Sequence, residues 1–117
     1  MAAVMEAERK LNRHPRQMPH DNPGYDIESQ DPANHRLLFI KVKGKAPGST
    51  TVTVSKTQIL TALNKQDDFI LAIVEVDGDR VREPRYIRRL FQREPDFGVT
   101  SVNYDLDKLL EKSERPA

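Results

Sequence analysis

Between residues 24 and 44 the chain reads Gly24-Tyr25-Asp26-Ile27-Glu28-Ser29 and, after a turn, Leu38-Phe39-Ile40-Lys41-Val42-Lys43-Gly44. Both segments carry the β-branched and aromatic residues that favour strands. Because side chains alternate across a strand, Lys41 and Lys43 should share one face of the second segment. Ile40 and Val42 then lie on its other face.

The acids of the first segment follow the same rule. Asp26 and Glu28 should lie together, on the face opposite Tyr25 and Ile27. If the two strands are neighbours, two acids and two lysines form one polar patch beside an apolar sheet face.

This arrangement resembles the PD-(D/E)XK nuclease fold, in which a first-strand acid and an acid-x-lysine triplet on the next strand hold a metal ion and a water. Asp26 matches the first acid, and Lys43 matches the lysine. Lys41 stands where the acid of the triplet belongs. The resemblance implies Mg²⁺ or Mn²⁺ as cofactor if the site is active, with Asp26 and the backbone carbonyl of Val42 as ligands.

Length and composition predict one small domain, 1–117, because 117 residues suffice for a single sheet with two or three helices. No apolar run approaches the roughly 20 residues of a membrane helix, and residues 1–11 do not resemble a signal peptide. The chain has no cysteine, which excludes disulfides and thiolate zinc sites. We therefore expect no membrane contact and a cytoplasmic location.

The net charge of +1 says little about nucleic acid, but the distribution of charge says more. Six arginines lie between residues 80 and 93 against the single acid Glu83, at positions 80, 82, 85, 88, 89 and 93. Such a cluster can contact phosphates. It can equally be a solvated edge strand and loop, since arginine also protects sheet edges from aggregation.

Residues 1–12 have the apolar spacing of an amphipathic helix, with Val4, Ala7 and Leu11 on one stripe. Glu8 borders that stripe. Many PD-(D/E)XK nucleases place a metal-binding acid on this helix, so Glu8 is a candidate ligand; the alternative is a surface acid with a structural ion pair. Residues 12–23 contain three prolines and are expected to form a loop.

The strands predicted next form a meander. Residues 24–29 and 36–44 should pair antiparallel through the turn Asp31-Pro32-Ala33-Asn34. Residues 50–54 alternate threonine and valine and should be the third strand. Ser55 and Gln58 then form a capping box that opens a helix to about residue 65. In the nuclease family a polar residue at this helix start often reaches the active site, so capping and catalysis compete for the Gln58 side chain.

Residues 69–76 form a continuous apolar run, typical of a strand buried on both faces. The helix before it should make a crossover from the third strand, so those two strands are expected to be parallel. A turn at 77–79 leads to a hairpin with Val81 or with residues 85–88. We expect residues 91–101 to be irregular, a helix over 106–112 with Asp105 as N-cap, and frayed residues 114–117.

The predicted order of helix, three strands, helix and strand is the shared core of the PD-(D/E)XK superfamily. The fold class is therefore α/β (α+β): a restriction-endonuclease-like core with a mixed sheet, an extra strand and a C-terminal helix. The core spans about 4–90 and a C-terminal extension about 91–112.

Within that superfamily, residues 4–112 look like the small C-terminal domain of bacterial helicase-like proteins and of the plant protein No Vein. The resemblance is carried by Glu8-Arg9, Asn22-x-Gly24-Tyr25-Asp26-Ile27-x-Ser29, Phe39-Ile40-x-Val42-Lys43-Gly44, Ile59-Leu60-Thr61-Ala62-Leu63-Asn64, Arg93-Glu94-Pro95-Asp96-Phe97-Gly98 and Ser101-Val102-Asn103-Tyr104. It implies a fragment or stand-alone relative of a larger nucleic-acid ATPase. No phosphate-binding Gly-x-x-x-x-Gly-Lys-Ser/Thr run occurs in the chain itself.

Three functional hypotheses follow from the lysine at position 41. In the first, Glu28 or Glu8 replaces the missing acid and the chain is a metal-dependent nuclease, with Asp26, Lys43 and Gln58 as its catalytic residues. In the third, the patch is only a set of salt bridges in a structural or partner-docking module.

The second hypothesis is the favoured one. Like charges about 4 Å apart cost about 4 kcal/mol at an effective dielectric constant of about 20, so Lys41 opposes a divalent cation. The metal site is then degenerate, and the domain binds nucleic acid, expected to be DNA, as an accessory to helicase or ATPase domains. The residues expected to contact its backbone are Lys41, Lys43, Lys45, Arg85, Arg88 and Arg89.

Overall fold

The computed structural model describes all residues from 1 to 117. It contains three helices and eight strands, which in chain order are α1 (Ala2–Lys10), β1 (His14–Gln17), β2 (Ile27–Asp31), β3 (Arg36–Lys45), β4 (Thr51–Ser55), α2 (Lys56–Asn64), β5 (Phe69–Asp77), β6 (Arg80–Val81), β7 (Arg85–Arg88), β8 (Ser101–Asp105) and α3 (Leu106–Lys112). None of the helices is long and apolar enough to cross a membrane.

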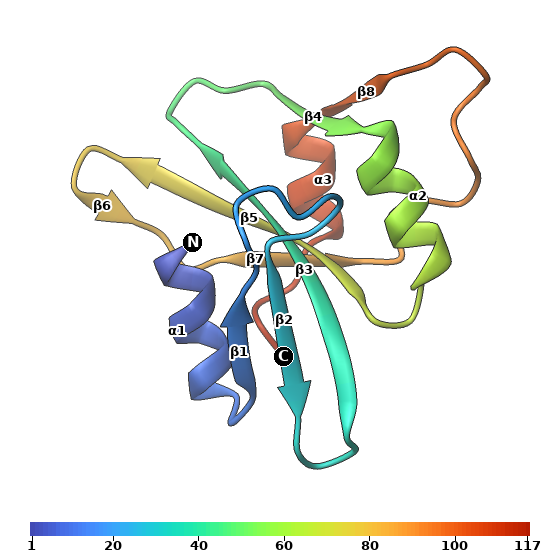
Figure 1. The fold of residues 1–117 in the computed structure, drawn as a ribbon. Coiled ribbons are helices and arrows are strands. Elements are labelled where there is room, and N and C mark those ends of the chain that lie inside the picture. The colour runs from blue at the N-terminus through green and yellow to red at the C-terminus, as the bar shows by residue number, and fades with distance from the viewer.

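A six-stranded mixed sheet forms the centre of the molecule, with the order β1-β2-β3-β5-β6 and β7 beside β5 (Figure 1). Strands β1, β2 and β3 are antiparallel neighbours. Strand β5 runs parallel to β3, and on its other side it pairs antiparallel with both β6 and β7. The mixed sheet is thus as predicted, and both suggested hairpin partners of β5 occur. The predicted parallel pairing of residues 69–76 with residues 50–54 was wrong, because the parallel neighbour of β5 is β3.

Two apolar clusters cover the two faces of this sheet. One lies beneath α1 and includes the fully buried Val4, Ile27 and Ile40. The other lies on the face covered by α2 and α3, and includes Ile59 and Leu71 (Figure 1). Because a fully buried aliphatic side chain contributes about 1.5–3 kcal/mol, the alternating apolar residues of β3 and β5 fix the register of the sheet.

Strand β4 corrects the predicted meander, because it leaves the main sheet. It pairs antiparallel with β8 in a separate two-stranded ribbon, in register from Thr51 with Asp105 to Ser55 with Ser101. The position beside β3 is instead taken by β5. The valines of β4 point to the core, as predicted, but they pack into the cluster under α2 and α3. Strand β8 itself was not predicted.

Residues 12–23 are not a simple loop, since β1 lies within them. This edge strand pairs with β2, and Pro15 lies opposite Ser29. Proline lacks an amide hydrogen and is tolerated on an edge strand, where one side needs no partner. Strand β2 begins at Ile27, three residues later than predicted, because residues 24–26 form a turn.

The helix caps agree with the sequence patterns. Ser55 Oγ accepts the amide of Gln58 at 3.1 Å, and Gln58 Oε1 accepts the amide of Ser55 at 3.2 Å. Asp105 Oδ1 accepts the amide of Lys108 at 3.1 Å and caps α3. The predicted capping box and N-cap are confirmed.

Candidate nucleic-acid interface

The turn before β2 positions Asp26. Gly24 has a φ of +91°, which side-chain-bearing residues rarely adopt, and an added Cβ would lie 2.4 Å from Thr61 Oγ1 on α2. The amide of Asp26 donates to Ile40 O at 2.8 Å, and its carbonyl accepts the amide of Met18 at 2.8 Å. Position 24 therefore requires glycine both for its φ angle and for its close approach to Thr61. The turn holds Asp26 against both β3 and the Met18 segment.

The Asp26 carboxylate binds two groups of β3. Its Oδ2 accepts the amide of Val42 at 2.8 Å. Its Oδ1 lies 3.3 Å from Lys41 Nζ in an ion pair, with the two side chains 23% and 19% exposed. The acid and the lysine that the sequence placed in one patch are thus in direct contact. The pair remains open to solvent.

Lys43 and Lys45 extend this patch along β3. Their side chains form no ion pair, and Lys43 is half-buried. Burial lowers the pKa of Lys43, and the neighbouring charges of Lys41 and Lys45 lower it further, while Asp26 acts in the opposite sense. The three alternate residues concentrate positive charge at the end of β3. We define Asp26, Lys41, Lys43 and Lys45 as the lysine patch.

Glu28 lies near this patch but is bound elsewhere. Arg16 donates to its Oε2 at 2.8 Å and Tyr25 Oη donates to its Oε1 at 2.9 Å. Burial alone would raise the pKa of Glu28, but the hydrogen bonds from Arg16 and Tyr25 outweigh it and lower that pKa. The predicted separation of Tyr25 from Glu28 was wrong, because Tyr25 belongs to the turn and does not follow strand alternation.

Glu8 lies on the other side of the sheet. It is fully buried in α1, beside Val4, and packs on the face to which Ile40 and Val42 point. Its carboxylate accepts a hydrogen bond from Tyr86 Oη at 2.7 Å. It also forms an ion pair with Arg13 Nη1 at 3.0 Å. Lys41 points to the opposite face, so the sheet separates Glu8 from Asp26.

These positions do not fit a divalent cation. Mg²⁺ requires several oxygen ligands in near-octahedral geometry. Asp26 is occupied by Lys41 and by the Val42 amide, and the other two candidate acids are bonded to arginine and tyrosine. No group of three or more histidine, cysteine, aspartate or glutamate side chains is placed to hold a metal.

Gln58 and the arginines also have structural partners. The Gln58 side chain is turned back to cap α2. Arg85 donates to Ser113, Arg88 donates to Ala117 O, and Arg89 is paired with Asp67. Arg85 and Arg88 point to opposite faces of β7. The arginines that cluster in the sequence therefore do not form one common surface in the structure.

Two residues beside the patch were missed by sequence reasoning. Arg16 lies on β1, which had been predicted as loop, so its contact with Glu28 could not be foreseen. Lys65 lies at the end of α2, and its Nζ is 4.3 Å from the centre of the Phe39 ring on β3. No pattern in the sequence marks this cation–π contact, because the two residues are brought together only by the crossover.

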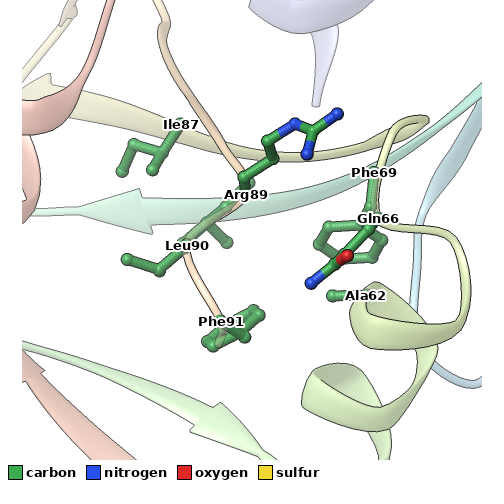
Figure 2. A pocket seen from close by; sticks show the side chains of 8 residues that line it. Ala62, Gln66, Phe69, Ile87, Arg89, Leu90 and Phe91 are labelled. Atoms are coloured by element: carbon green, nitrogen blue, oxygen red, sulfur yellow. The ribbon is translucent and has the colours of Figure 1, made fainter. Parts of the chain in front are cut away.

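A separate pocket lies between α2, β5 and the end of β7, and Figure 2 shows its lining. Apolar side chains dominate it, including Phe69, Leu90 and Phe91, with Arg89 and Gln66 at the rim. None of the predicted site residues except Arg89 lines this pocket. It belongs to the core packing of α2 rather than to the lysine patch.

Comparison with protein families gave one match for this chain. The model described as "Protein NO VEIN, C-terminal" matches residues 1–87, a span that contains α1, β1 to β7 apart from Arg88, and the whole lysine patch. No curated protein sequence matched.

The structure is similar to that of Hjc, a Holliday junction resolvase from the archaeal hyperthermophile Archaeoglobus fulgidus. The TM-score is 0.66 at 12% sequence identity, and the match covers 100% of this chain and 96% of that one. The chain thus has a restriction-endonuclease-like fold. At this identity the likeness establishes the fold alone.

Proposed function

This chain belongs to the family of NO VEIN C-terminal domains, and from that premise we propose that it is a nucleic-acid-binding accessory domain with a degenerate nuclease site. The observation that carries the proposal is the ion pair between Lys41 and Asp26, at 3.3 Å. In the nuclease fold Asp26 would bind the metal. Here an ammonium group takes the place of that cation.

Electrostatics support this assignment. A divalent ion beside Asp26 would also lie beside the Lys41 ammonium, and charges of like sign about 4 Å apart repel by about 4 kcal/mol per unit pair at an effective dielectric constant of about 20. Neither Glu8 nor Glu28 could offset this without breaking its own ion pair. Active cleavage with either acid as substitute ligand therefore has no support in this geometry.

The same lysines suit a phosphate backbone. Lys43 and Lys45 form no ion pair and lie two residues apart on one face of β3. Lysine contacts with phosphates release counterions, which makes the resulting affinity sensitive to salt. We propose DNA as the ligand. We further propose that the domain acts in the cytoplasm, within a larger helicase-like protein whose ATPase domains supply the motor.

Calorimetric titration with Mn²⁺ tests the metal part of the proposal, with Asp26→Asn as the control. We expect no binding to either protein. Binding to the unaltered chain that Asp26→Asn abolishes would overturn the degenerate site and favour a nuclease.

Fluorescence anisotropy with a labelled DNA oligonucleotide tests the binding part. The double substitution Lys41→Ala, Lys43→Ala should reduce affinity about tenfold or more at low salt, and should reduce the slope of log affinity against log salt by about two. Lys10→Ala with Lys112→Ala is the matched control, since both lysines are exposed on other elements and form no ion pair. Equal losses in both double variants would contradict a specific lysine patch.

A further inference from the structure

Phe97 occupies the corner of a tight turn in the segment between β7 and β8. The carbonyl of Asp96 accepts the amide of Val99 at 3.0 Å, which closes a four-residue turn. Gly98 has a φ of +90°, as a type II turn requires at its third residue. An added Cβ at Gly98 would meet nothing, so the backbone angle alone demands glycine. Phe97 is thus held at the second residue of a defined turn.

The ring of Phe97 has no apolar cover. Its relative exposure is 102%, and it is the only fully exposed aromatic residue of the chain. The other phenylalanines and tyrosines pack into the two clusters or against their edges. A large apolar side chain held in water is unfavourable, and such exposure is typical of a contact site.

The segment that carries this turn and the turn that holds Asp26 both lie against α2 (Figure 1). The amide of Lys56, the first residue of α2, donates to Thr100 O at 2.8 Å. Lys56 Nζ lies 5.8 Å from the centre of the Phe97 ring. The Gly24 turn that holds Asp26 packs against Thr61 of α2. The segment that carries the exposed ring therefore contacts the first residue of α2, and the turn that holds Asp26 contacts the same helix five residues further along.

Charge indicates what kind of contact the turn can make. The segment has Arg93 and the neighbouring Lys56, which are balanced by Glu94 and Asp96. The turn itself therefore offers little net attraction to a polyanion. Its distinctive group is the exposed π-face, and bases stack on such rings with little dependence on sequence.

We propose that Phe97 stacks on an unpaired base of a nucleic acid whose backbone lies on Lys41 and Lys43. This inference rests on the proposed function and narrows its ligand to single-stranded or branched nucleic acid. A protein interface would need a cluster of apolar side chains. In the segment from 92 to 100, Phe97 is the only exposed large apolar residue.

A tryptophan reporter tests the stacking directly. The chain contains no tryptophan, so Phe97→Trp places a single fluorophore on the turn. Single-stranded oligonucleotide should quench its emission. Val81→Trp is the matched control, because Val81 is 55% exposed on β6, away from α2. Its emission should stay unchanged at the same saturation.

Affinity measurements separate stacking from charge. Phe97→Ala should weaken binding of single-stranded DNA about tenfold, and of blunt duplex less than twofold, while Phe97→Tyr keeps the affinity. The slope of log affinity against log salt should not change, because no charge is removed.

The outcomes are distinguishable. Quenching at position 97 together with the selective loss in Phe97→Ala supports the inference. Unquenched emission at saturation, or equal losses for both DNA forms, overturns it but leaves the proposed binding intact. Absence of DNA binding by the unaltered chain at low salt overturns the proposed function and the inference together.

Discussion

Two acid–base clusters lie on opposite faces of the same sheet and show how differently similar side chains can be used. Beneath α1, Glu8 is fully buried between Arg13 and Tyr86. On the other face, Asp26 and Lys41 form a pair that solvent reaches. We call the first the closed cluster; the second is the lysine patch.

The difference lies in what each cluster leaves unbound. In the closed cluster both carboxylate oxygens and the tyrosine hydroxyl are bonded, and burial, with the Glu8 hydrogen bond next, raises the pKa of Tyr86. In the lysine patch Lys43 and Lys45 have no acid partner. A fully bonded buried network stabilises the fold, whereas unpaired cations at the surface can bind an anion.

The largest expected effect is on the closed cluster. Glu8→Ala leaves the nearly buried Arg13 with only its longer ion pair to Asp31, at 3.9 Å, and should lower the free energy of unfolding by about 3 kcal/mol. Urea unfolding measures this loss. DNA affinity per folded molecule should stay unchanged; a specific loss of affinity at full folding would place Glu8 in the functional site.

A comparably large change is expected in the lysine patch when its charge is reversed. Lys41→Glu replaces the cation that opposes a metal with a carboxylate beside Asp26. We expect Mn²⁺ binding to appear at about millimolar affinity, which corresponds to about 4 kcal/mol. Calorimetry detects it, and Lys41→Gln should not show it. A variant that folds but binds no metal would count against the assignment of position 41 to the nuclease motif.

Alkaline pH should act mainly on the closed cluster. The pKa of Tyr86 is raised above its ordinary value of 10.0 by burial and by the Glu8 hydrogen bond. Its contribution to stability is complete below about pH 10 and is lost as pH rises, because the unfolded tyrosine ionises first. Urea unfolding between pH 9 and 11 should show this decline. In Tyr86→Phe the decline should be shallower, with an initial loss of about 2 kcal/mol.

The smallest effect tests the border of the lysine patch. Gln58→Ala removes half of the capping box of α2 and should cost about 0.5–1 kcal/mol in thermal or urea unfolding. DNA affinity should change less than twofold. A loss of affinity as large as that of the lysine double variant would show that Gln58 acts in the site as well as in the cap.

Local patterns predicted much of the fold. The helix periodicity of residues 2–10, the capping box at Ser55 and the apolar run of β5 are each written within one segment. The contact between Asp26 and Lys41 was also predicted, although Asp26 lies one residue before β2 and is brought to Lys41 by its amide hydrogen bond to Ile40 O.

Other features depend on partners far along the chain. Strand β1 has no apolar alternation and exists through its pairing with β2. Strand β8, the partner of β4, begins at Ser101, which is 50 residues after β4 begins at Thr51. Glu8 looked like the border of a helix stripe, but Tyr86, 78 residues away, buries it. These contacts are decided by tertiary packing, which no local pattern records.

The β4–β8 ribbon also has a consequence for the order of assembly. Closing a long loop costs chain entropy before the ribbon contacts repay it, whereas the β2–β3 hairpin closes a short one. We therefore expect the ribbon to form after the folding transition state. Substitutions in it should then accelerate unfolding more than they slow folding. The segment that carries Phe97 leads directly into β8, so the exposed ring would reach its place beside α2 only in the last step of folding.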